Sequence, residues 1–230
     1  MASVSETNIL KALDFLKDTL AGGKYMQDNP YEHSYRYEHT TRVASYGREI
    51  ARAEGLDEEA LVIGCILHDV SYCNTFGYEV PWSQHGRDAA RIARPFLSQL
   101  EGWDAARVEE VCYGIAIHAD GKSDFDGPDT VLARSIADCD ELDGYDIFRV
   151  SENIRFWGFC EMDIPHKLEF LNKRLAESKG WQTLERATPT ATRMMRQRMA
   201  LREQVYTGMI EQFTRGQEFD LQYYDRLFNI

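Results

Sequence analysis

An adjacent His68-Asp69 pair ends a run of apolar residues, 61–67, and combines two kinds of metal ligand at one point of the chain. Neutral imidazole and carboxylate are both ligands that borderline and hard divalent metal ions accept. His39 lies upstream of the pair and Asp140 lies downstream of it. A His-Asp dipeptide alone is a weak signal, but the order His39, His68-Asp69, Asp140 indicates a divalent metal site.

Two further histidines lie where the hydrophobic pattern predicts buried positions. His85 begins a helix expected after the pair, and His118 follows Val111 and Ile115 at helical spacing. Burying one such polar group without a partner costs on the order of 1 to 3 kcal/mol. A single histidine on an apolar face is more often a hydrogen-bonded core residue, but several on converging faces favour a shared metal. The candidate ligands are His39, His68, Asp69, His85, His118 and Asp140.

Two carboxylates of one expected helix compete for the role of last ligand. Asp140 follows Ile136 by four residues, so it is expected on the buried face. Asp138 follows Arg134 by four residues, which favours an ion pair on the helix surface. Asp143 is a candidate to cap or contact the turn that follows. We therefore prefer Asp140 as the ligand, with Asp138 as the alternative.

The charge and composition narrow the class of partner. The chain of 230 residues has 26 Lys and Arg against 38 Asp and Glu, a formal net charge of −12. This charge argues against binding a nucleic-acid duplex or an anionic membrane, whereas a small anionic substrate fits, because a bound metal reverses the local field. No apolar stretch approaches the roughly 18 to 20 residues of a membrane span, and the start lacks a secretory pattern. The five cysteines form no C-x-x-C pair, which predicts a reduced, cytoplasmic protein.

The hydrophobic periodicity is helical almost throughout, and no convincing alternating strand appears. Loops rich in glycine, proline or aspartate are expected over about 71–83 and 120–128. The pattern predicts one all-α domain over 1–230, with a core of about 30–150 and C-terminal helices over about 160–216 packed on it. The oligomeric state stays open. Helices are expected over about residues 7–20, 38–54, 57–68, 84–100, 104–119, 129–143, 165–178 and 189–215.

Residues 30–150 resemble the HD-domain metal-dependent phosphohydrolase superfamily in the order and spacing of three motifs. These are His39, then Gly64-x-Ile66-Leu67-His68-Asp69, then Cys139-Asp140-Glu141-Leu142-Asp143. The segment 115–118 and the tail from His166-x-x-Glu169-x-Leu171 are similar to the small YedJ/YpgQ-like HD hydrolases. The resemblance implies an HD-domain helical bundle with additional C-terminal helices. It also implies a divalent ion (Mn, Fe, Ni, Co or Mg) and hydrolysis of a phosphate ester or anhydride, often in a nucleotide.

The resemblance also bears on the number of ions. His85 and His118 resemble the extra ligands of dinuclear HD proteins, in which the aspartate of the pair bridges two ions. In that case His39, His68, Asp69 and Asp140 hold the first ion, and Asp69, His85 and His118 hold the second. One or two ions remain open, as does the identity of the metal. Tyr72 stands where HD 5′-nucleotidases carry a glutamate, which argues against a monophosphatase that relies on that residue.

The sequence therefore predicts a metal-dependent phosphohydrolase that acts on a phosphoester or phosphoanhydride, with a small anionic substrate such as a nucleotide. Asp69, His85 and His118 are the expected catalytic group around a water whose pKa the metal lowers toward ~7. Lys122 and Arg42 are candidate phosphate contacts. One alternative is a dinuclear iron HD-type oxygenase of a small polar substrate. Another is a binding module without activity, whose usual mark, the loss of ligands, is missing here.

Overall fold

The structure is a computed structural model that describes residues 3–74 and 82–219 of the chain. Over these residues every regular element is a helix, either α or 3₁₀, and none is a strand. This confirms the predicted all-α fold class. The chain divides into two compact units, residues 1–143 with 185–191, and residues 144–184 with 192–230. The expectation of one domain, with the C-terminal helices packed on the core, stays a prediction.

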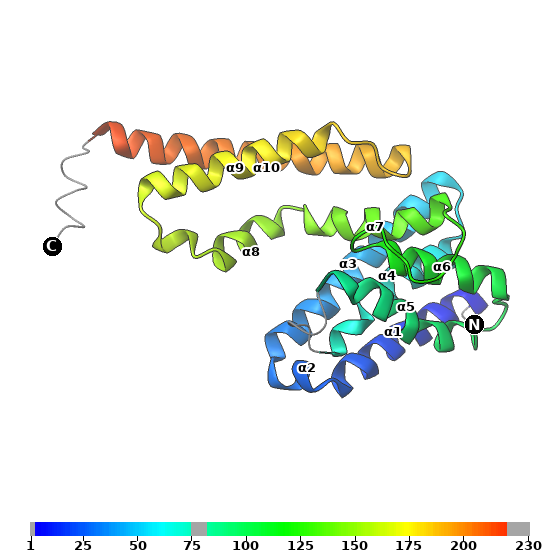
Figure 1. Cartoon of the computed structure of the whole chain (residues 1–230). Coiled ribbons are helices and arrows are strands. Elements are labelled where there is room, and N and C mark those ends of the chain that lie inside the picture. The colour runs from blue at the N-terminus through cyan, green and yellow to red at the C-terminus, as the bar shows by residue number, and fades with distance from the viewer. Residues whose placement is uncertain (1–2, 75–81, 220–230) are drawn as a thin grey trace. The chain divides into compact units, whose positions relative to one another are not determined.

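The first unit comprises α1 to α6 and nearly all of α7 (Figure 1), and all six candidate ligands belong to it. Within it α3 packs against α4, α5 against α6, and α4 against α6. Two 3₁₀ helices, Val70–Cys73 and Trp82–Gln84, lie between α4 and α5. Its α-helices are α1 (Val4–Gly22), α2 (Lys24–Asp28), α3 (Pro30–Glu54), α4 (Glu58–Leu67), α5 (His85–Leu97), α6 (Ala105–Ile117) and all but the last residue of α7 (Val131–Gly144).

Helix α4 is the centre of this unit, because each of its residues from Ala60 to Leu67 is buried. The Asp57 side chain caps the helix by accepting a hydrogen bond from the Ala60 backbone nitrogen at 3.0 Å, as expected. Gly64 permits a close approach to α7, since a Cβ atom there would lie 2.5 Å from Ile136 Cδ1. The glycine of the G-x-I-L-H-D segment therefore brings the end of α4 close to the helix that carries Asp140.

The second unit has its own small apolar core. Val150, Phe159, Leu171 and Tyr206 are buried together, and side chains of the last helix, such as Phe213, pack against them. The elements of this unit are α8 (Phe148–Phe156), a 3₁₀ helix at Phe159–Glu161, α9 (Ile164–Gln182) and most of α10 (Pro189–Phe219).

Most expected helices are present, with three differences. Helix α3 begins at Pro30 rather than near residue 38, because proline suits the first turn of a helix, where its missing N–H is not needed. Helices α2 and α8 were not expected, since both are short, at five and nine residues. The expected loop of 71–83 begins as a 3₁₀ helix, and residues 75–81 lie outside the described residues.

All five cysteines are free thiols, and Cys65, Cys112 and Cys139 are buried. None of the helices in the described ranges combines the length and the apolar character needed to cross a membrane.

Candidate metal centre

The His68-Asp69 pair lies directly after the last residue of α4, at the inner end of the buried helix. His68 is fully buried and Asp69 is 4% exposed. The Nδ1 atom of His68 lies 2.7 Å from the Cys65 carbonyl oxygen, so Nδ1 carries the proton and Nε2 presents its lone pair. The local turn of the chain therefore aims one imidazole nitrogen and one carboxylate into the same interior space.

The first group of donor atoms consists of His39, His68, Asp69 and Asp140. The Nε2 atom of His39 lies 3.2 Å from His68 Nε2, 3.2 Å from Asp140 Oδ1 and 3.5 Å from Asp69 Oδ2. The Nε2 atom of His68 lies 3.5 Å from Asp69 Oδ2 and 3.6 Å from Asp140 Oδ1. Ligand atoms that share one ion at about 2.0 to 2.2 Å lie roughly 3 to 3.5 Å apart. These four atoms have the spacing of a metal site.

The second group uses the other oxygen of the same aspartate. Asp69 Oδ1 lies 3.4 Å from His85 Nε2 and 3.6 Å from His118 Nε2, and these two nitrogens are 3.0 Å apart. His85 is the first residue of α5, and His118 directly follows α6. The two oxygens of Asp69 therefore face two different pairs of histidine nitrogens. Two groups of donor atoms lie close enough together to hold a metal ion, His39 with His68 and Asp140, and His68 with Asp69 and His118.

The hydrogen bonds of the four imidazoles test whether this donor set fits a cation. Each Nδ1 atom lies beside an oxygen acceptor, at 2.7 Å for His39, 2.7 Å for His68, 2.6 Å for His85 and 2.7 Å for His118. In neutral imidazoles with the ring proton on Nδ1, every Nε2 atom turns a lone pair toward its neighbours, and two such lone pairs repel each other unless a proton or a metal ion lies between them. The donor set therefore fits divalent metal ions.

Two charged pairs surround these ligands, and the sequence interpretation missed both. Asp143 Oδ2 accepts the hydrogen bond from His39 Nδ1, and Arg42 Nε donates to Asp143 Oδ1 at 2.5 Å. Arg36 Nη1 donates to Asp69 Oδ2 at 2.7 Å. A signal was available, because Arg36 lies three residues before His39 and Asp143 lies three residues after Asp140, one helical turn in each case.

The charges around the site shift the pKa values of its groups. Burial alone would raise the pKa of Asp69, but the neighbouring His68 and Arg36 and two histidine hydrogen bonds hold it well below its usual range. Burial would lower the pKa of His39, but hydrogen bonds to Asp140, Asp143 and Asp69 raise it to about 10. Burial lowers the pKa of His85. In the metal-free protein the carboxylates are thus ionised and His39 carries a proton.

The competing carboxylate, Asp138, has a different environment. Asp140 is 30% exposed and belongs to the first donor group, whereas Asp138 accepts a hydrogen bond from the Ala187 backbone nitrogen at 2.7 Å. The expectation of a surface position for Asp138 is wrong, because the segment 185–187 covers that face of α7 and leaves Asp138 only 7% exposed. Burial accordingly raises the pKa of Asp138.

The two candidate phosphate contacts lie in different surroundings. Arg42 is engaged with Asp143, with Nε and Nη2 at 2.5 and 3.1 Å from the two carboxylate oxygens. Lys122 is exposed in the loop after α6, where its backbone nitrogen donates to Asp120. Neither arrangement tests a contact with phosphate, so that role stays a prediction.

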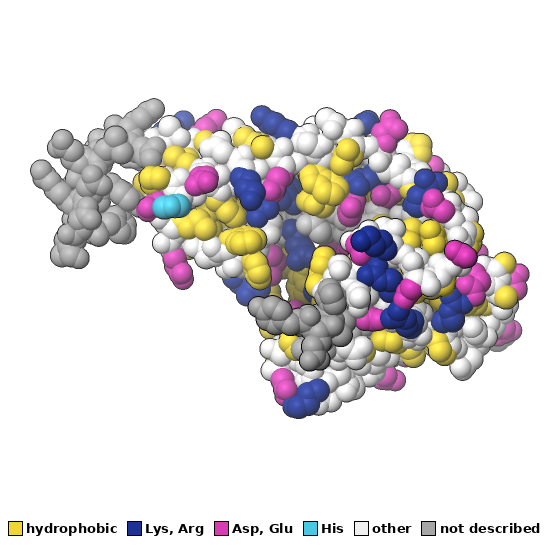
Figure 2. All heavy atoms as spheres, in the orientation of Figure 1, with side chains coloured by type: hydrophobic (Ala, Val, Ile, Leu, Met, Phe, Trp, Pro, Cys, Tyr) yellow, Lys and Arg dark blue, Asp and Glu magenta, His cyan; other side chains and the backbone are white. Residues whose placement is uncertain are grey.

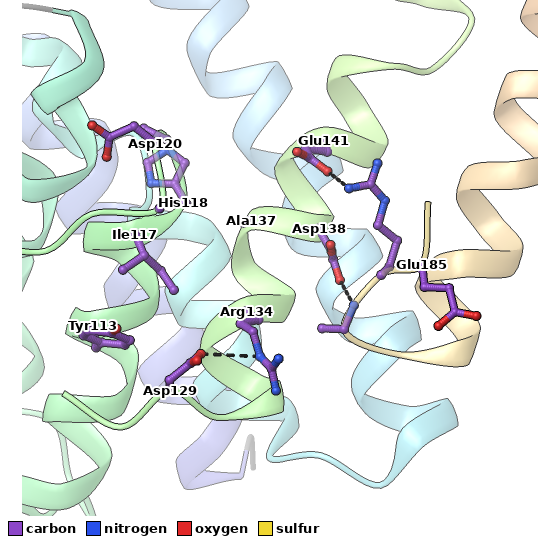
Figure 3. Close-up of a pocket in the computed structure, with 14 residues that line it drawn as sticks. Tyr113, Ile117, His118, Asp120, Asp129, Arg134, Ala137, Asp138, Glu141 and Glu185 are labelled. Atoms are coloured by element: carbon purple, nitrogen blue, oxygen red, sulfur yellow. Dashed lines mark hydrogen bonds and ion pairs between the residues drawn. The ribbon is translucent and has the colours of Figure 1, made fainter. Parts of the chain in front are cut away.

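A cavity of about 620 Å³ lies beside the centre, lined by the end of α6, residues 119–121, one face of α7 and residues 185–187 (Figure 3). Glu141 on α7 pairs there with Arg186, and burial raises the pKa of Glu141 to about 7 although Arg186 opposes the shift. His118 contributes to the wall, but its side chain is fully buried. The cavity is therefore separated from the His118 imidazole, which faces Asp69.

Comparisons with known proteins identify a known domain and a similar fold. Residues 36–145 match the profile of the HD domain. No curated protein matches the sequence. Among solved structures, the chain is similar to a predicted HD superfamily hydrolase from an uncultured Thermotogales bacterium, with a TM-score of 0.61 and 19% sequence identity. The similarity covers 89% of this chain and 92% of that one. Residues 36–145 span all six candidate ligands, and this part of the chain is identified as an HD domain.

Proposed function

We propose that this protein is a metal-dependent phosphohydrolase with two divalent ions at the centre. In this proposal His39, His68, Asp69 and Asp140 hold the first ion, and Asp69, His85 and His118 hold the second. The observation that carries the proposal is the position of Asp69, whose Oδ2 lies 3.5 Å from His39 and His68 Nε2 and whose Oδ1 lies 3.4 Å from His85 Nε2. One carboxylate between two imidazole sets would suit two ions about 3.5 to 4 Å apart, the usual spacing of two-metal sites.

When bound, divalent ions would supply the positive charge that lowers the pKa of water and neutralises phosphoryl oxygens. The residues of the chain set the conditions for that chemistry. Asp143 and three backbone carbonyls fix the orientation of the four imidazoles. Burial of His39, His68, Asp69 and His85 excludes bulk water, and the 30% exposure of the Asp140 side chain supports substrate entry from that side.

Charge supports a small anionic substrate, with nucleotides as the first class to test. Two divalent ions bring four positive charges against the negative charges of Asp69 and Asp140, and Arg36 adds a further positive charge. The centre would therefore attract phosphate groups although the chain as a whole carries −12. On the face drawn in Figure 2, Lys and Arg side chains lie among Asp and Glu rather than forming one continuous basic surface, which disfavours a nucleic-acid duplex as the partner.

The test is a panel of nucleotides and simple phosphoesters on protein purified without chelator, with metal analysis of the same sample. We expect release of phosphate or pyrophosphate under anaerobic conditions with Mn²⁺ or with redox-silent Mg²⁺. The Asp69→Ala variant is the matched control, and it should lose activity and bound metal while keeping its helical circular dichroism. Full activity of Asp69→Ala would overturn the proposal. A reaction that consumes O₂ and stops without it would replace hydrolysis with the iron oxygenase.

A further inference from the structure

Arg36 contacts the aspartate shared by both donor groups, and its side chain is mostly buried. Its Nη1 lies 2.7 Å from Asp69 Oδ2, and its guanidinium carbon lies 3.4 Å from the centre of the Tyr72 ring. The Arg36 side chain is only 16% exposed. A planar guanidinium that is stacked on a ring and hydrogen-bonded at one edge keeps one orientation. Arg36 therefore holds Asp69 Oδ2 at a fixed point.

Tyr72, the ring beneath Arg36, is itself fixed. It is 8% exposed and lies in the 3₁₀ helix that directly follows Asp69. Its hydroxyl oxygen accepts a hydrogen bond from Trp82 Nε1, and its ring centre lies 5.3 Å from that of His85. The backbone oxygen of Trp82 also accepts the hydrogen bond from His85 Nδ1 at 2.6 Å. Tyr72 thus contacts both Arg36 and His85, and Trp82 contacts both Tyr72 and His85.

The two donor groups depend on Asp69 to different degrees. Without Asp69, the first group retains three donors, from His39, His68 and Asp140, whereas the second retains only His85 and His118. We propose that Arg36, stacked on Tyr72, is a positioning residue that fixes the Asp69 carboxylate so that its Oδ1 completes the second ion site. This inference rests on the two-ion centre proposed above.

The positive charge of Arg36 weakens the binding of a metal ion, because like charges repel. A neutral substitution at residue 36 would remove this repulsion together with the positioning of Asp69, so the two effects could not be separated. Arg36→Lys separates them, since lysine keeps the charge but has neither the planar fork nor the stacking surface of arginine. Tyr72→Leu removes the ring and leaves Arg36 in place, while Tyr72→Phe keeps the ring.

The experiment is a titration of the metal-free full chain with Mn²⁺, followed by calorimetry and by the spin coupling between two Mn²⁺ ions in electron paramagnetic resonance. We expect Arg36→Lys and Tyr72→Leu to keep the first ion and to bind the second roughly 10- to 100-fold more weakly. Tyr72→Phe should resemble the wild type. Arg52→Lys is the matched control, because Arg52 lies on the same helix and pairs with Glu58 at 2.8 Å but is 65% exposed.

Retention of the first ion shows that a variant is folded. If Arg36→Lys fails to fold, the affinity of Tyr72→Leu for the second ion tests the inference. Wild-type affinity for the second ion in the folded variant overturns the inference and leaves the phosphohydrolase proposal intact. Equal weakening of both ions also overturns it, since Arg36 would then support the whole centre. A wild-type protein that binds a single ion overturns the two-ion centre and this inference together.

Discussion

Asp143 Oδ2 lies 2.7 Å from His39 Nδ1, on the side of the imidazole away from the donor atoms of His68 and Asp140. Asp143 is 3% exposed, and Arg42 Nε lies 2.5 Å from its other oxygen. Three side chains from α3 and α7 thus form a chain of hydrogen bonds that ends at a candidate ligand. A carboxylate in this place fixes the ring and increases the basicity of the ligand nitrogen.

The first prediction concerns this outer carboxylate. Asp143→Asn keeps the size of the side chain but removes its charge, so the His39 ring is held less firmly. We expect the affinity for the first ion to fall roughly 10- to 100-fold while the protein stays folded. Calorimetric titration with Mn²⁺ measures the change. Unchanged affinity would show that Asp143 only compensates Arg42.

The second prediction separates the two carboxylates of α7. Asp140→Ala should lose activity and the first ion, because Asp140 Oδ1 lies 3.2 Å from His39 Nε2. Asp138→Ala should keep the metal and most of the activity but lose about 1 kcal/mol of stability, since the Ala187 nitrogen loses its acceptor. Metal analysis and urea unfolding of both variants test this. Metal loss in Asp138→Ala alone would reverse the assignment.

The third prediction is that metal binding releases a proton. In the metal-free protein the pKa of His39 is raised to about 10 from an ordinary value of 6.5. A ligand imidazole must be neutral, so at pH 7 to 9 an incoming ion displaces the His39 proton, and affinity should rise with pH until about 10. Calorimetry in buffers of different ionisation enthalpy counts the protons released. A heat that does not depend on the buffer would contradict the shift.

The same shift predicts how the stability of the metal-free protein depends on pH. A histidine with a raised pKa in the folded state adds stability that is complete below about 6.5 and is lost as the pH rises through about 10. The free energy of unfolding of chelator-treated protein should therefore fall between pH 7 and pH 10. His39→Gln is the control, and its curve should fall less over the same range. Parallel curves would show that other groups dominate.

Much of the fold follows from local signals in the sequence. The apolar run 61–67 with Asp57 before it predicts α4 and its capping residue, because aspartate is a preferred residue at the start of a helix. Helices α2 and α8 do not follow, because five and nine residues are too few for a helical repeat of apolar residues to be recognised. The split into two compact units depends on contacts between distant parts of the chain, which periodicity does not report.

The site was predictable where helical spacing decides which face a residue occupies. Asp140 follows Ile136 by one turn, and its carboxylate lies beside His39 and His68 as expected. The roles of Arg36 and Asp143 were not predicted, because charged residues next to a ligand are usually exposed on a helix, and only the packing of α3 against the site buries them. Spacing places a side chain on a face, but it does not give its partner.

The central claim is that Asp69 joins two metal ions, and the most direct measurement is the anomalous scattering of crystals of the full chain grown with Mn²⁺. The account predicts two peaks roughly 3.5 to 4 Å apart. One should lie among His39, His68 and Asp140, the other beside His85 and His118, with Asp69 between them. A single peak, with His85 and His118 bound only to protein groups, would contradict the two-ion centre.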